Sequence, residues 1–273
     1  ARGAVVGDAL AAVLEATGHA VHREYYVNDA GSQIDDLARS VHLRYRESLG
    51  EEIAEIPEGL YPGNYVKDVA ARVRAEIGDE WSDLEESEWL PTFRRLSAER
   101  LLDVIKGDLA ALGVKHDGFI RESKMHADGR LKDALREMRK RGLVYDGVPA
   151  PPKGSKAKAG AGEADARERS LFATTRFGDD QDRTVLKPDG TPTYFAGDVA
   201  YHRDKCDRGY DLLIDVLGAD HVGYVPRLKA VVQAVSKGAT ELEAALVQMV
   251  SLTRDGAPVK MSKRSGDFVT LRD

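Results

Sequence analysis

The chain has 273 residues, a length that fits one large α/β domain carrying an insertion. No apolar stretch approaches the roughly 18 to 20 residues that cross a bilayer, and the single cysteine, Cys206, excludes an internal disulfide, so we expect a cytoplasmic protein that does not enter membranes. The formal net charge of −6 gives no general affinity for RNA, so any RNA contact must come from local basic clusters.

The first segment of the chain is predicted to form a helix followed by a strand. Apolar residues recur at helical spacing over residues 5–17, and Gly18 stands where a C-terminal cap belongs. Valine and tyrosine predict a strand over 21–27, followed by a loop over 28–31. Such a helix and strand form one step of a βαβ pattern.

The middle of the chain is predicted to be mostly helical. Amphipathic patterns predict one helix over 99–112, ended by Gly113, and another over 131–141. Residues 117–121 are the best strand candidate there. Residues 148–168 are rich in proline, glycine, alanine and lysine, so we expect an exposed, mobile loop near them.

After this loop the alternation of strand and helix resumes. Residues 211–217 and 246–252 are predicted strands, and residues 226–235 are a predicted helix with Pro226 near its first turn. The two ends of the chain therefore look like halves of one parallel sheet.

These patterns predict an α/β fold in three parts. Residues 1–48 form the first half of a Rossmann-like nucleotide-binding domain, 49–183 a largely helical insertion, and 184–273 the second half. In such sheets ligands bind beyond the carboxyl ends of the strands. We therefore expect the site where the two halves meet.

A basic loop follows the last predicted strand. Residues 260–266 read Lys-Met-Ser-Lys-Arg-Ser-Gly. Lys260 and Lys263 can neutralise charge on the α-phosphate and on leaving pyrophosphate, and a mobile loop can close around the activated complex. An isolated lysine-rich heptamer is usually a basic surface turn, so its meaning depends on the segments that accompany it.

The heptamer resembles the KMSKS signature of class I aminoacyl-tRNA synthetases, with Arg264 in place of the final serine. Seven other segments resemble bacterial arginyl-tRNA synthetases in the same order: residues 1–8, 24–31, 61–63, 177–180, 193–195, 198–202 and 218–221. The resemblance covers essentially the whole chain. It implies a catalytic domain that activates L-arginine with ATP, releases AMP and pyrophosphate over the reaction, and transfers arginine to tRNA(Arg).

The start of the chain bears on this expectation. In the family, the segment like Ala1-Arg2-Gly3 directly follows a HIGH-type signature whose histidines hold the ATP phosphates at a helix N-terminus. The printed sequence does not contain that signature, so the resemblance leads us to expect a first half that is truncated at its start. We expect this chain alone to activate arginine poorly or not at all.

Recognition of arginine needs carboxylates, because a guanidinium is planar, always charged and best held by bidentate acceptors. The resemblance assigns the arginine pocket to Tyr194 and Asp198, one helical turn apart, with the tyrosine ring or hydroxyl against the guanidinium. Without the resemblance, Tyr194 reads as a core aromatic and Asp198 as a helix cap.

Other polar residues are candidates for the same pocket. Asn28 and Asp29 follow a predicted strand and are candidates for the amino or carboxylate group of arginine, and Gln33 lies one turn further on. A turn that caps the next helix is an equally good interpretation of Asn28 and Asp29. For Gln33 the alternative is a side chain that faces solvent.

The nucleotide candidates follow the two late strands. Gly218 would allow close approach of a ribose, and Asp220 would accept its hydroxyls or serve arginine. The resemblance implies that His221 packs against adenosine and that Met249 and Val250 offer backbone groups to adenine. The resemblance also implies that Lys260, Ser262 and Lys263 bind ATP.

The ligands implied are L-arginine, ATP with Mg²⁺ as a substrate complex, and tRNA(Arg). We expect no tightly bound cofactor, the sequence has no zinc-like Cys/His spacing, and the resemblance favours a monomer. Two alternatives stay open: another class I synthetase or related nucleotidyltransferase, and a non-catalytic arginine- or RNA-binding paralogue. A dehydrogenase is disfavoured because no G-x-G-x-x-G follows the first strand.

Overall fold

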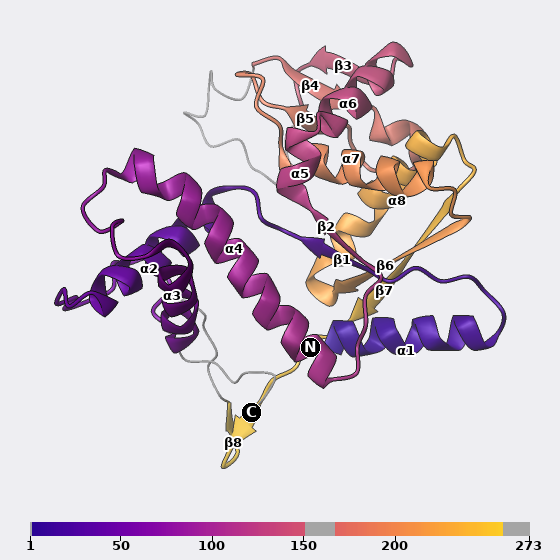
Figure 1. Ribbon diagram of the computed structural model, residues 1–273. Helices are drawn as coiled ribbons and strands as arrows, with labels where there is room; N and C mark the ends of the chain where they lie inside the picture. The colour runs from indigo at the N-terminus through magenta and orange to yellow at the C-terminus, as the bar shows by residue number, and fades with distance from the viewer. Residues whose placement is uncertain (1, 151–166, 259–273) are drawn as a thin grey trace. The chain divides into compact units, whose positions relative to one another are not determined.

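The computed structural model describes residues 2–150 and 167–258, which form two compact units. The first unit holds Gly3–Phe119 and continues from Val250, and the second holds Arg2 and Ile120–Met249. The fold is mixed α/β with parallel strands, as predicted (Figure 1). Across the described residues, every helix is too short or too polar to span a bilayer. The three-part division at residues 48 and 183 stays a prediction.

The first unit begins with the predicted helix and strand. It contains α1 (Arg2–Ala16), β1 (Glu24–Val27), α2 (Ser32–Ser48), α3 (Asn64–Ile77) and α4 (Glu86–Ala111). Gly18 ends the first helix with a φ of 91°, a conformation that glycine adopts without steric cost. The predicted strand over 21–27 is shorter than expected, since pairing covers only its last four residues.

The second predicted helix of the chain is longer than its sequence pattern suggested. The amphipathic pattern predicts a start at residue 99, whereas α4 starts at Glu86. Glu85 and Glu88 form a reciprocal capping box at its start, and Pro91 lies inside the helix. A proline normally breaks a helix interior, which is why the early turns were missed.

Three helices of the first unit enclose an aromatic core. Tyr45, Trp89 and Phe93, from α2 and α4, are buried together, and the ring of His42 stacks on Trp89 with centroids 3.8 Å apart. Burial lowers the pKa of His42, whose Nε2 lies 3.0 Å from the backbone oxygen of Trp81. The sequence analysis did not predict this core, because its residues lie on α2 and on the early turns of α4, outside the predicted helices.

Two short pairings complete the first unit. β2 (Gly118–Arg121), within one residue of its predicted bounds, forms a two-stranded sheet with β1. β8 (Thr253–Arg254) and β9 (Ala257–Pro258) form a hairpin. Asp255 and Gly256 both have positive φ, as a two-residue hairpin turn requires.

The second unit contains most of the strands. Its elements are α5 (Glu122–Ala127), α6 (Arg130–Lys140), β3 (Val144–Gly147), β4 (Arg169–Phe172), η1 (Thr174–Phe177), β5 (Arg183–Leu186), α7 (Tyr194–Asp207), β6 (Leu212–Gly218), η2 (Ala219–Tyr224), α8 (Val225–Ser236) and β7 (Glu241–Val247). The predicted helices over 131–141 and 226–235 and the predicted strand over 211–217 are confirmed within one residue at each end.

The antiparallel sheet β3-β4-β5 was not predicted. Each of its strands has only four residues, too few for a clear alternation of apolar and polar side chains. Phe172 and Val185 are fully buried and join α6, α7 and α8 in one apolar core. Residues 151–166 of the predicted loop lie outside the described residues, and Val148 beside them is exposed.

β6, α8 and β7 form a parallel strand-helix-strand unit (Figure 1). Leu212 pairs with Glu241 at one end of the two strands, and Gly218 pairs with Val247 at the other. The predicted strand over 246–252 is therefore wrong beyond Val247. The strand instead uses an alternating segment in which Leu242 is buried between exposed glutamates, a pattern typical of a sheet with one solvated face.

The aromatic core of the first unit gives a stability prediction. Phe93→Ala removes a fully buried ring that contacts Tyr45, Trp89 and His42. It should lower the free energy of unfolding by about 3–5 kcal/mol, because the transfer free energy is lost and a cavity remains. Denaturant unfolding measures this, with the exposed Val13→Ala as control. Equal effects of the two substitutions would contradict the assigned core.

Candidate functional site

Two of the predicted arginine-binding residues, Tyr194 and Asp198, lie on the first two turns of α7. Thr193 anchors the start of the helix, since its N–H donates to Val185 O at 3.0 Å and its hydroxyl to Thr184 O at 2.8 Å. Tyr194 is 71 % exposed, so it is not a core aromatic. Asp198 lies one turn into the helix rather than at its N-cap, so the helix-cap interpretation is wrong.

Asp198 is partly buried and is hydrogen-bonded by one tyrosine. The hydroxyl of Tyr224 donates to its Oδ2, and within 2–150 and 167–258 no other side chain donates to this carboxylate. Burial raises the pKa of Asp198 above its usual range, although the Tyr224 hydrogen bond and the nearby His202 act to lower it. The site therefore holds a carboxylate in a poorly solvated place with one defined donor.

A buried polar cluster joins α7 to β6. His202 lies 2.8 Å from the backbone oxygen of Asp198 through Nδ1 and 2.9 Å from Asp215 Oδ2 through Nε2. Lys205 donates to Asp215 Oδ1 at 2.8 Å. Burial alone would raise the pKa of Asp215, but His202 and Lys205 together hold it well below its usual range. The cluster fixes Asp198 relative to the strand that ends at Gly218.

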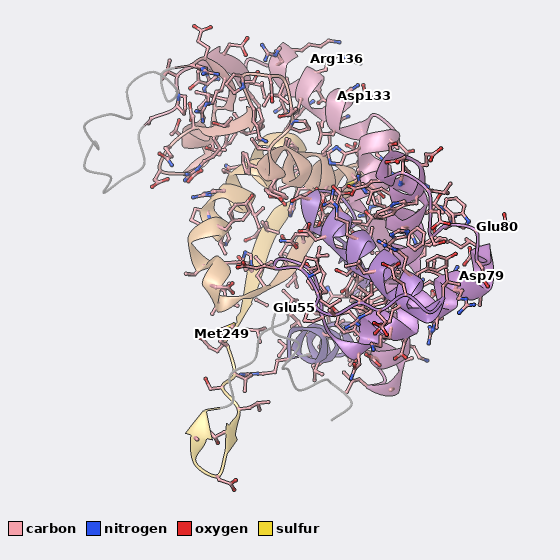
Figure 2. The ribbon with its side chains drawn as sticks, turned by 90° about the vertical axis from the view of Figure 1, so that its left-hand side faces the viewer. Glu55, Asp79, Glu80, Asp133, Arg136 and Met249 are labelled. Carbon is pink, nitrogen blue, oxygen red and sulfur yellow. The ribbon has the colours of Figure 1, made fainter. Side chains whose placement is uncertain are left out.

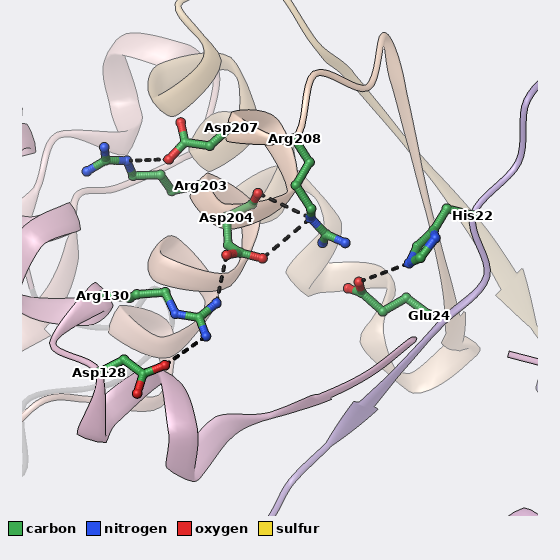
Figure 3. Close-up of polar contacts among 8 residues, drawn as sticks. All are labelled: His22, Glu24, Asp128, Arg130, Arg203, Asp204, Asp207 and Arg208. Atoms are coloured by element: carbon green, nitrogen blue, oxygen red, sulfur yellow. Dashed lines mark hydrogen bonds and ion pairs between the residues drawn. The ribbon is translucent and has the colours of Figure 1, made fainter. Parts of the chain in front are cut away.

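The far end of α7 is held by a second set of ion pairs (Figure 3). Arg130 of α6 bridges Asp128 at 3.0 Å and Asp204 at 2.7 Å. Arg208 also approaches Asp204, at 3.5 Å. Both ends of the helix are thus fixed within the second unit.

The predicted nucleotide residues follow β6 directly. At Gly218 a Cβ atom would lie 2.3 Å from Asp220 Oδ1, so the glycine allows the aspartate to fold back over the chain. Asp220 and His221 are exposed, with His221 Nε2 3.8 Å from Asp220 Oδ2. Both residues lie on η2, which ends at Tyr224, so the Tyr224 hydrogen bond connects this segment to Asp198.

The remaining candidates for the arginine pocket belong to the first unit. Asn28 and Gln33 are exposed and Asp29 is buried, all in the first unit. Gly31, rather than Asn28 or Asp29, occupies the N-cap position of α2. Their role at the arginine stays a prediction.

Met249 and Val250 are not strand core. They follow the end of β7, and Met249 is 77 % exposed (Figure 2). Their predicted backbone contacts with adenine stay untested. Lys260, Ser262 and Lys263 lie outside the described residues.

Four residues of the site were not predicted: His202, Lys205, Asp215 and Tyr224. A helical spacing could have indicated two of them, because His202 and Lys205 lie four and seven residues after Asp198, on the same face of α7. Asp215 and Tyr224 belong to other elements, and no sequence spacing indicates that they meet α7.

A cavity of about 440 Å³ lies beside Tyr224 in the second unit. It is lined by Gly178, Asp179, Asp180, Gln181, Arg183, Gly223, Pro226 and Arg227. Arg183 is paired with Asp179 at 2.7 Å, and the guanidinium of Arg227 lies 5.2 Å from the centre of the Tyr224 ring. The wall of this cavity therefore includes the cation that covers Tyr224.

Comparison with known proteins identifies relatives of this chain. No family model matches the chain. An arginine–tRNA ligase of Methylorubrum extorquens (strain PA1) is 53 % identical over 274 residues, which cover 100 % of this chain and 46 % of that protein. The chain is a homologue of the arginyl-tRNA synthetases. An arginine–tRNA ligase of Rhodopseudomonas palustris is 51 % identical and is covered to 45 % of its length, so the chain spans less than half of these curated relatives.

Solved structures support the same relationship. A crystal structure assigned to arginyl-tRNA synthetase from Campylobacter jejuni has a TM-score of 0.79 and 34 % identity, over 99 % of this chain and 54 % of that one. The arginyl-tRNA synthetase of Plasmodium falciparum has a TM-score of 0.50 and 14 % identity, which supports the fold alone. The homology is thus visible in both sequence and structure.

The cluster around Asp215 gives a stability prediction. Asp215→Asn leaves Lys205 and His202 without their carboxylate and should cost about 3–5 kcal/mol in the free energy of unfolding. Because the pKa of Asp215 is lowered, this stabilisation is present above the ordinary carboxyl pKa and is lost as pH falls through the folded value.

Denaturant unfolding at neutral pH measures this difference. The control is Asp133→Asn, which breaks the exposed pair of Asp133 and Arg136 on α6 (Figure 2) and should cost at most about 1 kcal/mol. Similar losses for both variants would refute the buried cluster.

Gly218 gives a prediction about the nucleotide. Gly218→Ala should displace the flexible Asp220 side chain and raise the KM for ATP several-fold, with little change in the free energy of unfolding. Gly223→Ala is the control, since nothing lies within 4 Å of its Cβ position. An unchanged KM for ATP in Gly218→Ala would remove Asp220 from the nucleotide site.

Proposed function

We propose that the protein containing this chain activates L-arginine with ATP and transfers it to tRNA(Arg). The homology with arginine–tRNA ligases supports the reaction. The observation that carries the substrate choice is the partly buried Asp198 carboxylate, one turn from the exposed Tyr194. A fixed carboxylate beside an accessible aromatic ring is suited to a planar, permanently charged guanidinium.

The site fits arginine better than lysine. Asp198 Oδ2 already accepts a hydrogen bond from Tyr224, so in this proposal the second oxygen would bind the guanidinium. A guanidinium carries donors in a fixed fork, whereas an ammonium is a compact point charge that is more strongly hydrated. A buried acceptor left unpaired by the wrong side chain costs binding free energy, and this difference underlies discrimination.

The proposed reaction needs positioning more than covalent help. The arginine carboxylate attacks the α-phosphate of ATP, a new O–P bond forms, and pyrophosphate leaves with the electrons of the broken bond. The 3′-terminal ribose hydroxyl of the tRNA then attacks the carbonyl of arginyl-adenylate, and AMP leaves. Orientation and stabilisation of phosphate charge dominate such transfers.

The other predicted residues have supporting roles in this proposal. Asp220, after the close approach at Gly218, would accept the ribose hydroxyls, and His221 would pack on adenosine. Lys260 and Lys263 would neutralise the phosphates. Asn28, Asp29 and Gln33 would hold the amino and carboxylate groups of arginine, Met249 and Val250 the adenine, and Mg²⁺ enters with ATP.

The proposal predicts a selective effect of one substitution. Asp198→Asn should raise the KM for arginine by about 10–100-fold, because a charge-assisted hydrogen bond is lost. The KM for ATP should change little. Arginine-dependent ATP–pyrophosphate exchange by the full-length protein, with tRNA(Arg) present, measures both constants.

Asp207→Asn is the matched control. Asp207 lies on the same helix, is exposed, and pairs with Arg203 at 3.2 Å. Its substitution should leave both constants unchanged. Equal rises in the two KM values for Asp198→Asn would remove Asp198 from the arginine pocket, and binding of arginine without exchange would favour a non-catalytic paralogue.

A further inference from the structure

Tyr224 is held rigidly between two helices of the second unit. It ends η2 and precedes α8, and its ring packs edge-on against Phe195 of α7 with centroids 6.4 Å apart. The guanidinium of Arg227 lies over the Tyr224 ring, 5.2 Å from its centre. The hydroxyl therefore has a defined direction, and it donates to Asp198.

Tyr224 keeps its proton in this place. Burial and the charge of Asp198 both raise the pKa of Tyr224 above its usual range. A neutral phenol donates one hydrogen bond, and its partner carboxylate accepts it. Tyr224 is thus a permanent donor to Asp198 over the working pH range of an enzyme.

Other charged groups near Asp198 both raise and lower its pKa. Asp215 on β6 and Glu122 on α5 raise the pKa of Asp198, while His202 on its own helix lowers it. Lys205 partly compensates Asp215, and His126 lies 3.7 Å from Glu122. Burial has the largest effect on the pKa of Asp198 and favours the neutral carboxyl. The Tyr224 hydrogen bond has the largest effect in the opposite direction.

We propose that Tyr224 is a positioning residue for arginine recognition, which keeps Asp198 ionised and turns its second oxygen toward the guanidinium. This inference rests on the proposed function. Tyr224 does not need to touch arginine itself. It sets the charge and orientation of the group that does, and it joins that group to the segment that carries Asp220.

A conservative substitution tests this role. Tyr224→Phe removes the hydroxyl and leaves the ring that contacts Phe195 and Arg227. The KM for arginine should rise by about tenfold at mildly acidic pH, while the KM for ATP changes little. Because loss of the donor raises the pKa of Asp198, the rise in KM on lowering pH should begin at a higher pH than in the wild type.

Preference for arginine over citrulline supplies a second readout. Citrulline has nearly the same shape but no charge, so an ionised Asp198 favours arginine and a neutral one does not. Competition by citrulline in the exchange assay should therefore become relatively stronger in Tyr224→Phe as pH falls. A purely structural role would not change this ratio with pH.

Tyr145→Phe is the matched control. The Tyr145 hydroxyl donates to Asp182 Oδ2 at 2.5 Å, so this variant also loses a tyrosine–aspartate hydrogen bond within the second unit. It should leave the KM for arginine and its pH profile unchanged. A changed profile in this control equal to that of Tyr224→Phe would overturn the inference.

If Tyr224→Phe does not fold, a second variant tests the positioning role of Tyr224. Incorporation of 3-fluorotyrosine at position 224 keeps the ring shape and makes the hydroxyl a stronger donor, so the rise in KM should move to lower pH. Profiles that coincide with wild type would overturn the role of Tyr224. Absence of arginine-dependent exchange in the wild-type protein would instead overturn the proposed function.

Discussion

The candidate site depends on one buried interaction, the contact of Asp215 with His202 and Lys205. Two partners from one helix hold a single carboxylate on the neighbouring strand, at 2.9 and 2.8 Å. Removing charges from water is costly unless each is paired, so this contact tolerates little displacement of α7 along β6. The contact therefore fixes the position of α7 relative to β6. As a result it also fixes Asp198, near the start of α7, relative to Gly218, at the end of β6.

This arrangement explains how a moderately buried carboxylate serves as a ligand-binding group. A buried carboxyl tends to become neutral, and a neutral Asp198 would lose most of its attraction for a guanidinium. The hydroxyl of Tyr224 and the nearby His202 oppose this tendency. Because Tyr224 ends the segment that begins after Gly218, the same hydrogen bond relates the proposed arginine pocket to the proposed nucleotide site.

The sequence predicted local features better than contacts between distant segments. Helices with a strong apolar period, such as the one over 131–141, were predicted within a residue, and Tyr194 and Asp198 could be placed on one helical face. The sheet β3-β4-β5 was missed because its strands are too short to show a period. Tyr224 lies 26 residues from Asp198 and reaches it only through the packing of α7 on α8, which no spacing rule contains.

The most direct test of the central claim is a crystal structure of the full-length protein with a non-hydrolysable arginyl-adenylate analogue. In this complex a guanidinium nitrogen should lie roughly 3 Å from the Asp198 oxygen that does not accept from Tyr224. The ring of Tyr194 should lie beside the guanidinium, and the ribose should lie near Asp220. A guanidinium bound to other carboxylates, with Asp198 contacting protein groups alone, would contradict the proposed arginine pocket.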